Sequence, residues 1–260
     1  SRSIGSSACS GSVKRRAAAA MESGDMDALG AAVNPDPNTY PVVLTGDFTG
    51  DSTSDLFFHS PSAAPDLLYD YDRIETVDPA AHEMVLRIHT FDVQGSYRPV
   101  VGFFGGTYNS PMDIFWYQPG AAPDMIWDFL TGCESWECTE PPAYKVLPQR
   151  VMGTYQPFVG SFSSSSTSDI FWYAPGAAQD WVWSYHRTCV GGCRTTRHDR
   201  AVSVNGTYRP VVGEFLEGAY DNDDIFWYSP AGGEESIWDY SSYLDTTATI
   251  IKPSVLQVVN

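Results

Sequence analysis

Apolar residues in this chain fall into short runs. From about residue 40 onward, stretches rich in valine, isoleucine, phenylalanine and tryptophan alternate with turns rich in glycine, proline, serine and aspartate. Runs of this kind, bounded by turn residues, are typical of β-strands. A helical solenoid would show a 3.6-residue period, which the sequence lacks. The pattern therefore predicts an all-β protein.

The strand pattern occurs four times along the chain. One marker reads DLFFHSPSAAPDLLYDY in its first copy, and its copies begin at Asp55, Asp113, Asp169 and Asp224. A second marker, of the type YRPVVG, begins at Tyr40, Tyr97, Tyr155 and Tyr208, spaced 57, 58 and 53 residues apart. Self-similarity at such a period indicates a repeat architecture.

Each copy contains four predicted strands. The first is the PVVG run, the second is DIFWY, and the third is the MIWDF or WVWSY segment. The fourth is weaker and is predicted at Met84–Phe91, Lys145–Met152, Arg200–Val204 and Ser254–Val259. Four strands in a repeat of roughly 50 to 60 residues are the pattern of a propeller blade.

We therefore expect a four-bladed β-propeller of four-stranded antiparallel blades. The predicted blades are residues 40–96, 97–154, 155–207 and 208–260. We expect the ring to close within one chain, because closure removes exposed sheet edges.

The motifs resemble the FG-GAP/VCBS repeats of β-propellers. The resemblance rests on Gly46–Asp51 (GDFTGD), on the aspartate that opens each DIFWY strand and on the recurrent Gly-x-Phe. It extends over residues 40–260, and it implies a Ca²⁺ loop in the first copy with Asp47, Asp51 and Asp55 as ligands. Ser52 stands where the sharp-turn glycine would be, and the alternative is a polar turn whose aspartates cap backbone N–H groups.

Residues 1–39 differ from the repeats. They are rich in serine, glycine and alanine, and their acidic and basic residues are equal in number. We expect an N-terminal arm or linker, with a short helix at Ala17–Ala32 that Gly24 and Gly30 weaken. The segment lacks the apolar run of an intact signal peptide. Its Cys9 is able to pair between chains.

The charge of the chain bears on its partners. Against 32 Asp and Glu stand 15 Lys and Arg, a net charge of −17. This charge repels a phosphate backbone, so nucleic acid is not an expected partner. No stretch approaches the roughly 18 uninterrupted apolar residues of a membrane span, and no span is expected.

Four of the five cysteines form two close pairs between predicted third and fourth strands. The pairs are Cys133 with Cys138 and Cys189 with Cys193. Local disulfides are the simplest interpretation, and they predict an oxidising compartment and a secreted or cell-surface protein. The rival interpretation is a zinc site that adds His186 and His198 to the second pair, although this spacing fits no common zinc finger.

The aromatic residues of the strands are predicted to be core. Sugar-binding proteins use such rings as stacking platforms, but blade strands are covered on both faces and must fill an apolar space in every copy. The predicted core rings are Trp116, Trp172 and Trp227, with Phe58 in the first copy, and the third-strand rings Tyr69, Trp127, Trp183 and Trp238.

Catalytic motifs are absent from the sequence. It contains no G-x-S-x-G or H-E-x-x-H, and its five histidines are scattered. His59 replaces the tyrosine that the other copies have at the end of DIFWY. A buried, hydrogen-bonded histidine is the favoured interpretation over a catalytic one.

A ligand face is predicted at one mouth of the propeller channel. Its rim would consist of Tyr97, Arg98, Tyr155, Gln156, Tyr208 and Arg209. In a four-fold ring Arg98 and Arg209 would face each other and could hold a carboxylate or a sulfate, unless each pairs with an aspartate of the chain. Trp136, in a cysteine loop of the opposite face, is the second candidate.

We expect a non-catalytic, lectin-like binding protein with carbohydrate at a cell or matrix surface as its ligand. One alternative is a secreted enzyme whose site is the channel mouth, built from tyrosine, arginine and His59. The other is a surface or filament protein that self-associates through the N-terminal arm. Calcium is the one cofactor that the sequence suggests.

Overall fold

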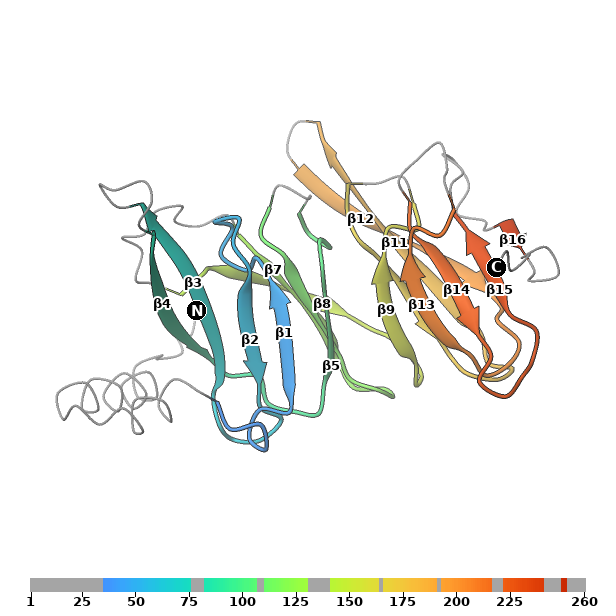
Figure 1. Cartoon of the computed structure of the whole chain (residues 1–260), viewed down its shortest axis with the longest axis horizontal. Helices are drawn as coiled ribbons and strands as arrows, with labels where there is room; N and C mark the ends of the chain where they lie inside the picture. Colours follow the sequence, from blue (N-terminus) through green and yellow to red (C-terminus); the bar gives the residue numbers. More distant parts are fainter. Residues whose placement is uncertain are drawn as a thin grey trace, which may run out of the picture. The chain divides into compact units, whose positions relative to one another are not determined.

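The described chain consists of β-strands. A computed structural model describes residues 35–75, 82–106, 110–130, 141–163, 166–190, 193–216, 222–240 and 249–251, with the backbone alone at 72–75, 82–85, 193 and 249. These ranges contain four sheets, each of four antiparallel strands, and no helix (Figure 1). The predicted all-β class with four-stranded antiparallel sheets is confirmed.

Each sheet is made from one copy of the repeat, with its strands in chain order. The first contains β1 (Val42–Gly46), β2 (Asp55–His59), β3 (Asp66–Glu75) and β4 (His82–Phe91). The second contains β5 (Arg98–Gly102), β6 (Asp113–Tyr117), β7 (Asp124–Phe129) and β8 (Tyr144–Gln149). The third contains β9 (Gln156–Gly160), β10 (Asp169–Tyr173), β11 (Asp180–Cys189) and β12 (Cys193–Val202). The fourth contains β13 (Arg209–Gly213), β14 (Asp224–Tyr228), β15 (Ser236–Asp239) and β16 (Thr249–Ile251).

The fourth strands differ most from the prediction. Strand β12 starts at Cys193, well before the predicted Arg200, because a continuous ladder pairs it with β11 from Asp180 to Cys189. The segment that begins β12 is polar, so its hydrophobic pattern carries no strand signal. Strand β16 lies at Thr249–Ile251, whereas the predicted Ser254–Val259 falls outside the described residues.

The chain divides into two compact units. The first comprises residues 1–97 and 129–144, and the second comprises residues 98–128 and 145–260. In the first unit, Phe48 packs against Phe57 and Phe129, with ring centroids 6.2 and 5.6 Å apart, and Phe57 packs against Phe91. These rings form the core beside the first sheet.

In the second unit, consecutive sheets pack through aromatic rings. The ring centroids of Tyr117 in β6 and Trp172 in β10 are 5.0 Å apart, and those of Tyr173 in β10 and Trp227 in β14 are 5.2 Å apart. Both pairs pack edge to face. The same contact thus recurs one repeat further along the chain. Edge-to-face rings at such distances stabilise a core beyond the area they bury.

The predicted core rings are buried with two exceptions. Trp116, Trp172 and Trp227 are at most 1% exposed, and Tyr69, Trp127 and Trp183 are also buried. Phe58 and Trp238 are only half-buried. These exceptions lie in the first and the fourth repeat.

Several predictions fall outside the described residues. This group consists of residues 1–34 of the predicted N-terminal arm, including Cys9, and of Cys133, Cys138 and Trp136. Among the residues that are described, no helix is long and apolar enough to cross a membrane.

Candidate functional site

The aspartate that opens each DIFWY strand is a buried structural group. Asp55, Asp113, Asp169 and Asp224 are all fully buried. In each, one carboxylate oxygen accepts hydrogen bonds from the backbone where the first strand turns away, for example from Phe104 N at 2.8 Å to Asp113. The Gly-x-Phe and the aspartate recur together because the carboxylate satisfies the N–H groups of that turn.

A second buried aspartate holds the start of the third strand in three of the repeats. Asp124 accepts N–H bonds from Gln118 at 2.7 Å and from Val151 at 2.6 Å. Asp180 likewise accepts two backbone hydrogen bonds, from Ala174 N in the preceding turn and from Val204 N, both at 2.7 Å. This carboxylate joins the turn after the second strand to the segment that follows the fourth strand.

A tyrosine hydroxyl makes a further link to the next repeat. The Tyr173 hydroxyl donates to Gly206 O at 2.9 Å and accepts from Tyr208 N at 2.8 Å. Tyr117 makes the same pair of bonds to Gly153 and Tyr155. Gly206 has φ of +138°, and a Cβ there would lie 2.7 Å from the Tyr208 ring, so glycine is required.

The fourth repeat departs from this scheme at two positions. Glu235 stands where the other copies have Asp66, Asp124 and Asp180. Tyr228, the counterpart of Tyr173, is 42% exposed. Glu235 and Tyr228 therefore do not reproduce the arrangement in which Asp180 and Tyr173 bond to the segment that follows β12.

Two tyrosines of the predicted channel rim, Tyr155 and Tyr208, pack against core tryptophans. Tyr155 packs on Trp172 with centroids 6.2 Å apart, and Tyr208 packs on Trp227 at 6.1 Å. Arg98 donates to the backbone carbonyl of Tyr155 at 3.1 Å, a partner different from the expected aspartate. Gln156 and Arg209 are exposed at the starts of β9 and β13, and Tyr97 is half-buried. A shared ligand face for these residues stays a prediction.

The acidic loop of the first repeat is engaged in capping its own turn. Asp47 accepts N–H bonds from Gly50 at 2.6 Å and Ser52 at 2.9 Å, and Asp51 accepts one from Thr53 at 2.8 Å. Ser52 adopts a positive φ of 70°, at the position where glycine would be expected. No group of three acidic, histidine or cysteine side chains in the described residues could hold a metal ion. The calcium prediction stays a prediction.

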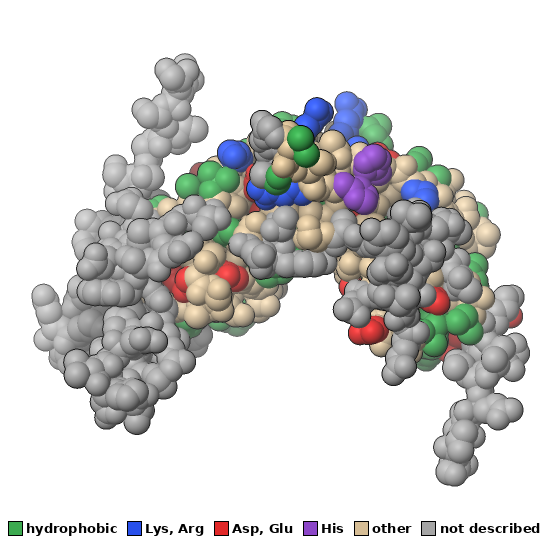
Figure 2. Space-filling view, turned by 90° about the horizontal axis from the view of Figure 1, so that it is seen from above, with side chains coloured by type: hydrophobic (Ala, Val, Ile, Leu, Met, Phe, Trp, Pro, Cys, Tyr) green, Lys and Arg blue, Asp and Glu red, His purple; other side chains and the backbone are tan. Residues whose placement is uncertain are grey.

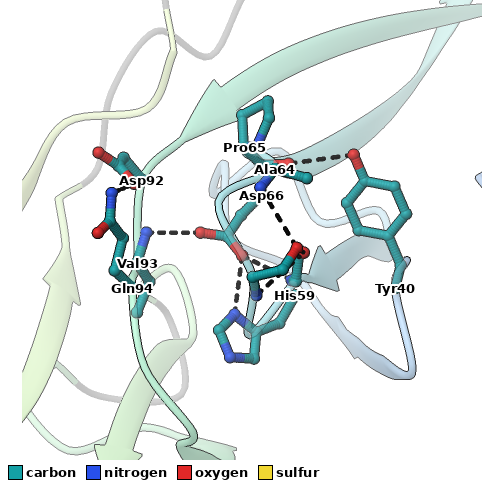
Figure 3. Close-up of polar contacts among 10 residues, drawn as sticks. Tyr40, His59, Ala64, Pro65, Asp66, Asp92, Val93 and Gln94 are labelled. Atoms are coloured by element: carbon teal, nitrogen blue, oxygen red, sulfur yellow. Dashed lines mark hydrogen bonds and ion pairs between the residues drawn. The ribbon is translucent and has the colours of Figure 1, made fainter. Parts of the chain in front are cut away.

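His59 and Asp66 form a buried pair in the first unit. His59 Nδ1 lies 2.7 Å from Asp66 Oδ1, and both side chains are fully buried. Figure 3 shows the Asp66 carboxylate between the His59 ring and the Val93 backbone, whose N–H donates to it at 2.6 Å. The interpretation of His59 as a buried, hydrogen-bonded histidine is confirmed.

The hairpin of β11 and β12 carries one of the two cysteine pairs. Its ladder places Cys189 directly opposite Cys193. His186 lies near His198, with ring centroids 5.0 Å apart, on a surface where Figure 2 shows histidines beside basic side chains. Because His186 and Cys189 are three residues apart on one strand, their side chains leave opposite faces. A single zinc ion bound by both is incompatible with this register.

A pocket opens between the third and fourth repeats, within the second unit. Its volume is about 160 Å³. Three aromatic residues line it, Tyr208, Trp227 and Trp238, together with two acids, Glu234 and Glu235. The remaining polar lining residues are Ser203, Asn205 and Ser236. No lysine, arginine or histidine is among the described residues that line it.

The pocket lies where the fourth repeat departs from the third. In the third repeat the positions of Glu234 and Glu235 hold Gln179 and Asp180. Gln179 donates a hydrogen bond to the carbonyl of Val202, and Asp180 accepts one from Val204 N. Both side chains therefore bond to backbone groups of the third repeat itself.

The sequence prediction found only Tyr208 among these pocket residues. The signal that could have found the acids is the aspartate-to-glutamate change at position 235. The arrangement offers apolar ring surface and hydrogen-bond acceptors together, which is the composition of a small-molecule site. No family model, no curated protein and no solved structure matches this chain.

Proposed function

We propose that this protein is a non-catalytic carbohydrate-binding protein whose ligand occupies the pocket between the third and fourth repeats. The observation that carries the proposal is the lining: aromatic rings beside carboxylate, amide and hydroxyl groups. A sugar presents C–H groups on its faces and hydroxyls around its edge. Tyr208 and Trp238, both half-buried, supply ring surface for the faces. Glu234 and Glu235 supply acceptors for the hydroxyls.

The size of the pocket limits how much of the ligand it covers. Its volume of about 160 Å³ is smaller than that of a typical drug-sized site, which is at least about 300 Å³. It accommodates part of one sugar ring, so the rest of an oligosaccharide would extend over the surface. We therefore expect weak binding to single sugars and stronger binding to oligomers.

The test is a glycan array followed by calorimetry on its best oligosaccharide. We expect binding by the natural protein and a loss of about tenfold or more in Glu235→Gln, since a carboxylate acceptor is worth roughly 1.5 to 3 kcal/mol. The control is Glu214→Gln, an exposed glutamate outside the pocket lining, which should bind normally. Absence of binding to every glycan, or equal binding by both variants, would overturn the proposal.

We further propose that the four sheets form a closed propeller of the FG-GAP/VCBS type. In the second unit, the Ser168 N–H donates to Phe103 O at 2.9 Å, and the Asp223 N–H donates to Ser161 O at 2.8 Å. Each bond joins a repeat to the one that follows it. If the ring closes in the same way, the backbone N–H of Ser54 in the first repeat would donate to the backbone carbonyl of Glu214 in the fourth repeat.

The exposure of the terminal sheets supports closure. Phe215 and Tyr228 of the fourth repeat are 43% and 42% exposed, whereas their counterparts Phe162 and Tyr173 are buried by the following sheet. Phe58, the counterpart of Trp172, is half-buried in the first repeat. Two apolar sheet faces thus lack the cover that their counterparts have.

A disulfide tests closure directly. In a Ser54→Cys, Glu214→Cys double variant, mild oxidation should link the two introduced cysteines within one chain, as peptide mapping would show. A Ser54→Cys, Gln179→Cys variant is the matched control and should stay unlinked. A link only between chains, or none, would contradict closure in one chain.

We also propose export, with a disulfide between Cys189 and Cys193. The two residues form the terminal register pair of a hairpin, and paired backbones bring cysteines within bridging distance. Non-reducing peptide mapping should recover this link and the predicted link between Cys133 and Cys138. Free thiols at these positions would overturn both the pairing and the inferred oxidising compartment.

A further inference from the structure

We propose that the hairpin of β11 and β12 binds an anionic polysaccharide on the face that it turns toward the fourth repeat. This site is separate from the pocket, and only the choice of a polysaccharide over another polyanion rests on the proposed function. The inference begins from the distribution of charge. In a chain of net charge −17, residues 186–200 hold four arginines, two histidines and one aspartate.

The register of the hairpin sorts these side chains onto two faces, because register partners share a face and successive residues alternate. Arg187, Thr195 and Arg197 lie on the face toward the second repeat. There Arg187 and Thr195 donate to Gly105 O at 3.2 and 2.8 Å. Arg197 donates to the Gln149 side chain at 2.8 Å. Both arginines of this face therefore already have partners within the protein.

The opposite face carries a row of basic side chains. The row consists of Arg194, His186, His198 and Arg200. The residues beside them on this face are Thr188, Thr196, Ser184 and Val182, so the described face holds no carboxylate along the row. Arg194 and His198 are exposed, and Figure 2 shows the histidines at the surface beside basic side chains. The row is therefore accessible to an anion.

The inner end of the row offers unpaired hydrogen-bond donors. Arg200 lies against Tyr240 of the fourth repeat, with its guanidinium carbon 6.0 Å from the ring centroid. The Arg200 Nε and Nη2 atoms and the hydroxyl of the fully buried Tyr240 are shielded from solvent, and none has a hydrogen-bond partner among the described residues. Buried donors without acceptors are costly, and a guanidinium matches the oxygens of a sulfate or a carboxylate. These donors point to an anion independently of the net charge of the row.

The length of the row favours a polymer over a single ion. Arg194 and Arg200 both belong to β12 and are separated by about 20 Å along the strand. A free sulfate or phosphate would contact only one of them. A chain with an anionic group on successive units contacts both arginines and the histidines between them, whose ring N–H groups are also donors. Arg200 as a whole is only half-buried, so such a group can reach it from the surface.

The experiment measures the binding of low-mass dextran sulfate by calorimetry, with uncharged dextran of the same length as the reference. We expect dextran sulfate to bind the natural protein at least about tenfold more tightly than dextran, and higher salt to weaken this binding. The variant Arg194→Gln, Arg200→Gln should bind dextran sulfate about tenfold more weakly. The matched control is Lys145→Gln, Arg150→Gln, which removes the same charge from two exposed side chains of the second repeat and should bind normally.

A single variant keeps the test valid if the double variant fails to fold. Arg194→Gln changes only the exposed end of the row and leaves Arg200 and Tyr240 in place. It should weaken the binding of dextran sulfate about threefold. Unchanged binding by this variant, or equal losses in the hairpin and control variants, would overturn the site.

Two further outcomes separate this inference from the proposed function. Tighter binding of polyglutamate or duplex DNA than of dextran sulfate would overturn the assignment to a polysaccharide. If dextran sulfate does not bind while a neutral oligosaccharide of the glycan array does, the hairpin site is overturned and the proposed function stands. If neither binds, both are overturned.

Discussion

The third and fourth repeats share the DIFWY strand and differ in what surrounds it. In the third repeat, Asp180 and Tyr173 bind the segment that leads to the next repeat, through Val204, Gly206 and Tyr208. In the fourth repeat, Glu235 replaces the aspartate and Tyr228 is exposed. The DIFWY strands β10 and β14 are identical in sequence, and each pairs with the first strand of its repeat in the same register.

The difference teaches which residues of the motif build the sheet and which join the repeats. The opening aspartate and the tryptophan are buried in both repeats, because every sheet needs its turn satisfied and its face filled. The second aspartate and the tyrosine act between elements. In the fourth repeat Glu235 replaces the aspartate, and the pocket lies beside it.

The largest contrast is expected at the second acid. Asp180→Ala should lower the free energy of unfolding by about 3 kcal/mol, because two buried backbone N–H groups lose their acceptor. Glu235→Ala should change it by less than about 0.5 kcal/mol, as for a surface substitution. Chemical denaturation of both variants measures the difference. Equal effects would mean that Glu235 replaces Asp180 in function.

A second comparison concerns the tyrosine. Tyr173→Phe removes a hydroxyl that makes two hydrogen bonds and should cost about 2 kcal/mol. In the closed ring that we propose, Tyr228 would bond the segment before β1, so Tyr228→Phe should cost nearly as much. Denaturation midpoints of the two variants measure both costs. A cost below about 0.5 kcal/mol for Tyr228→Phe, as for a surface substitution, would contradict closure.

Much of the sheet structure could be predicted from the sequence, because the strands alternate strongly with turn residues and the repeats confirm one another. The weak point was the fourth strand, since the polar start of β12 is held by its ladder and carries no hydrophobic pattern. Tyr208 was the one pocket residue predicted. The aspartate-to-glutamate change could have pointed to Glu235. Glu234 and Asn205 could not be found, because the sequence does not show which turns lie beside one another in space.

The smallest expected effect is a dependence of stability on pH. Burial raises the pKa of Asp169 to about 7, and it outweighs the hydrogen bonds that lower this pKa. Burial likewise raises the pKa of Asp55 to about 7. An aspartate in an unfolded chain titrates near pH 3.9, so between about pH 4 and 7 the folded state binds more protons than the unfolded state.

The free energy of unfolding should therefore fall as the pH rises across that window. We expect a thermal midpoint a few degrees higher at pH 5.5 than at pH 7.5. Asp169→Asn cannot titrate, so it should reduce this difference, and Glu214→Gln should not. A midpoint that rises with pH over the same range would contradict the assignment.

The most direct measurement of the central claim is to give the fourth repeat the residues of the third. The variant Glu234→Gln, Glu235→Asp installs the Gln179–Asp180 pair in the pocket, and calorimetry with the best oligosaccharide of the glycan array compares it with the natural protein. We expect at least about tenfold weaker binding, with a free energy of unfolding equal to or above that of the natural protein. Unchanged binding by a folded variant would show that the pocket of the fourth repeat is not the site.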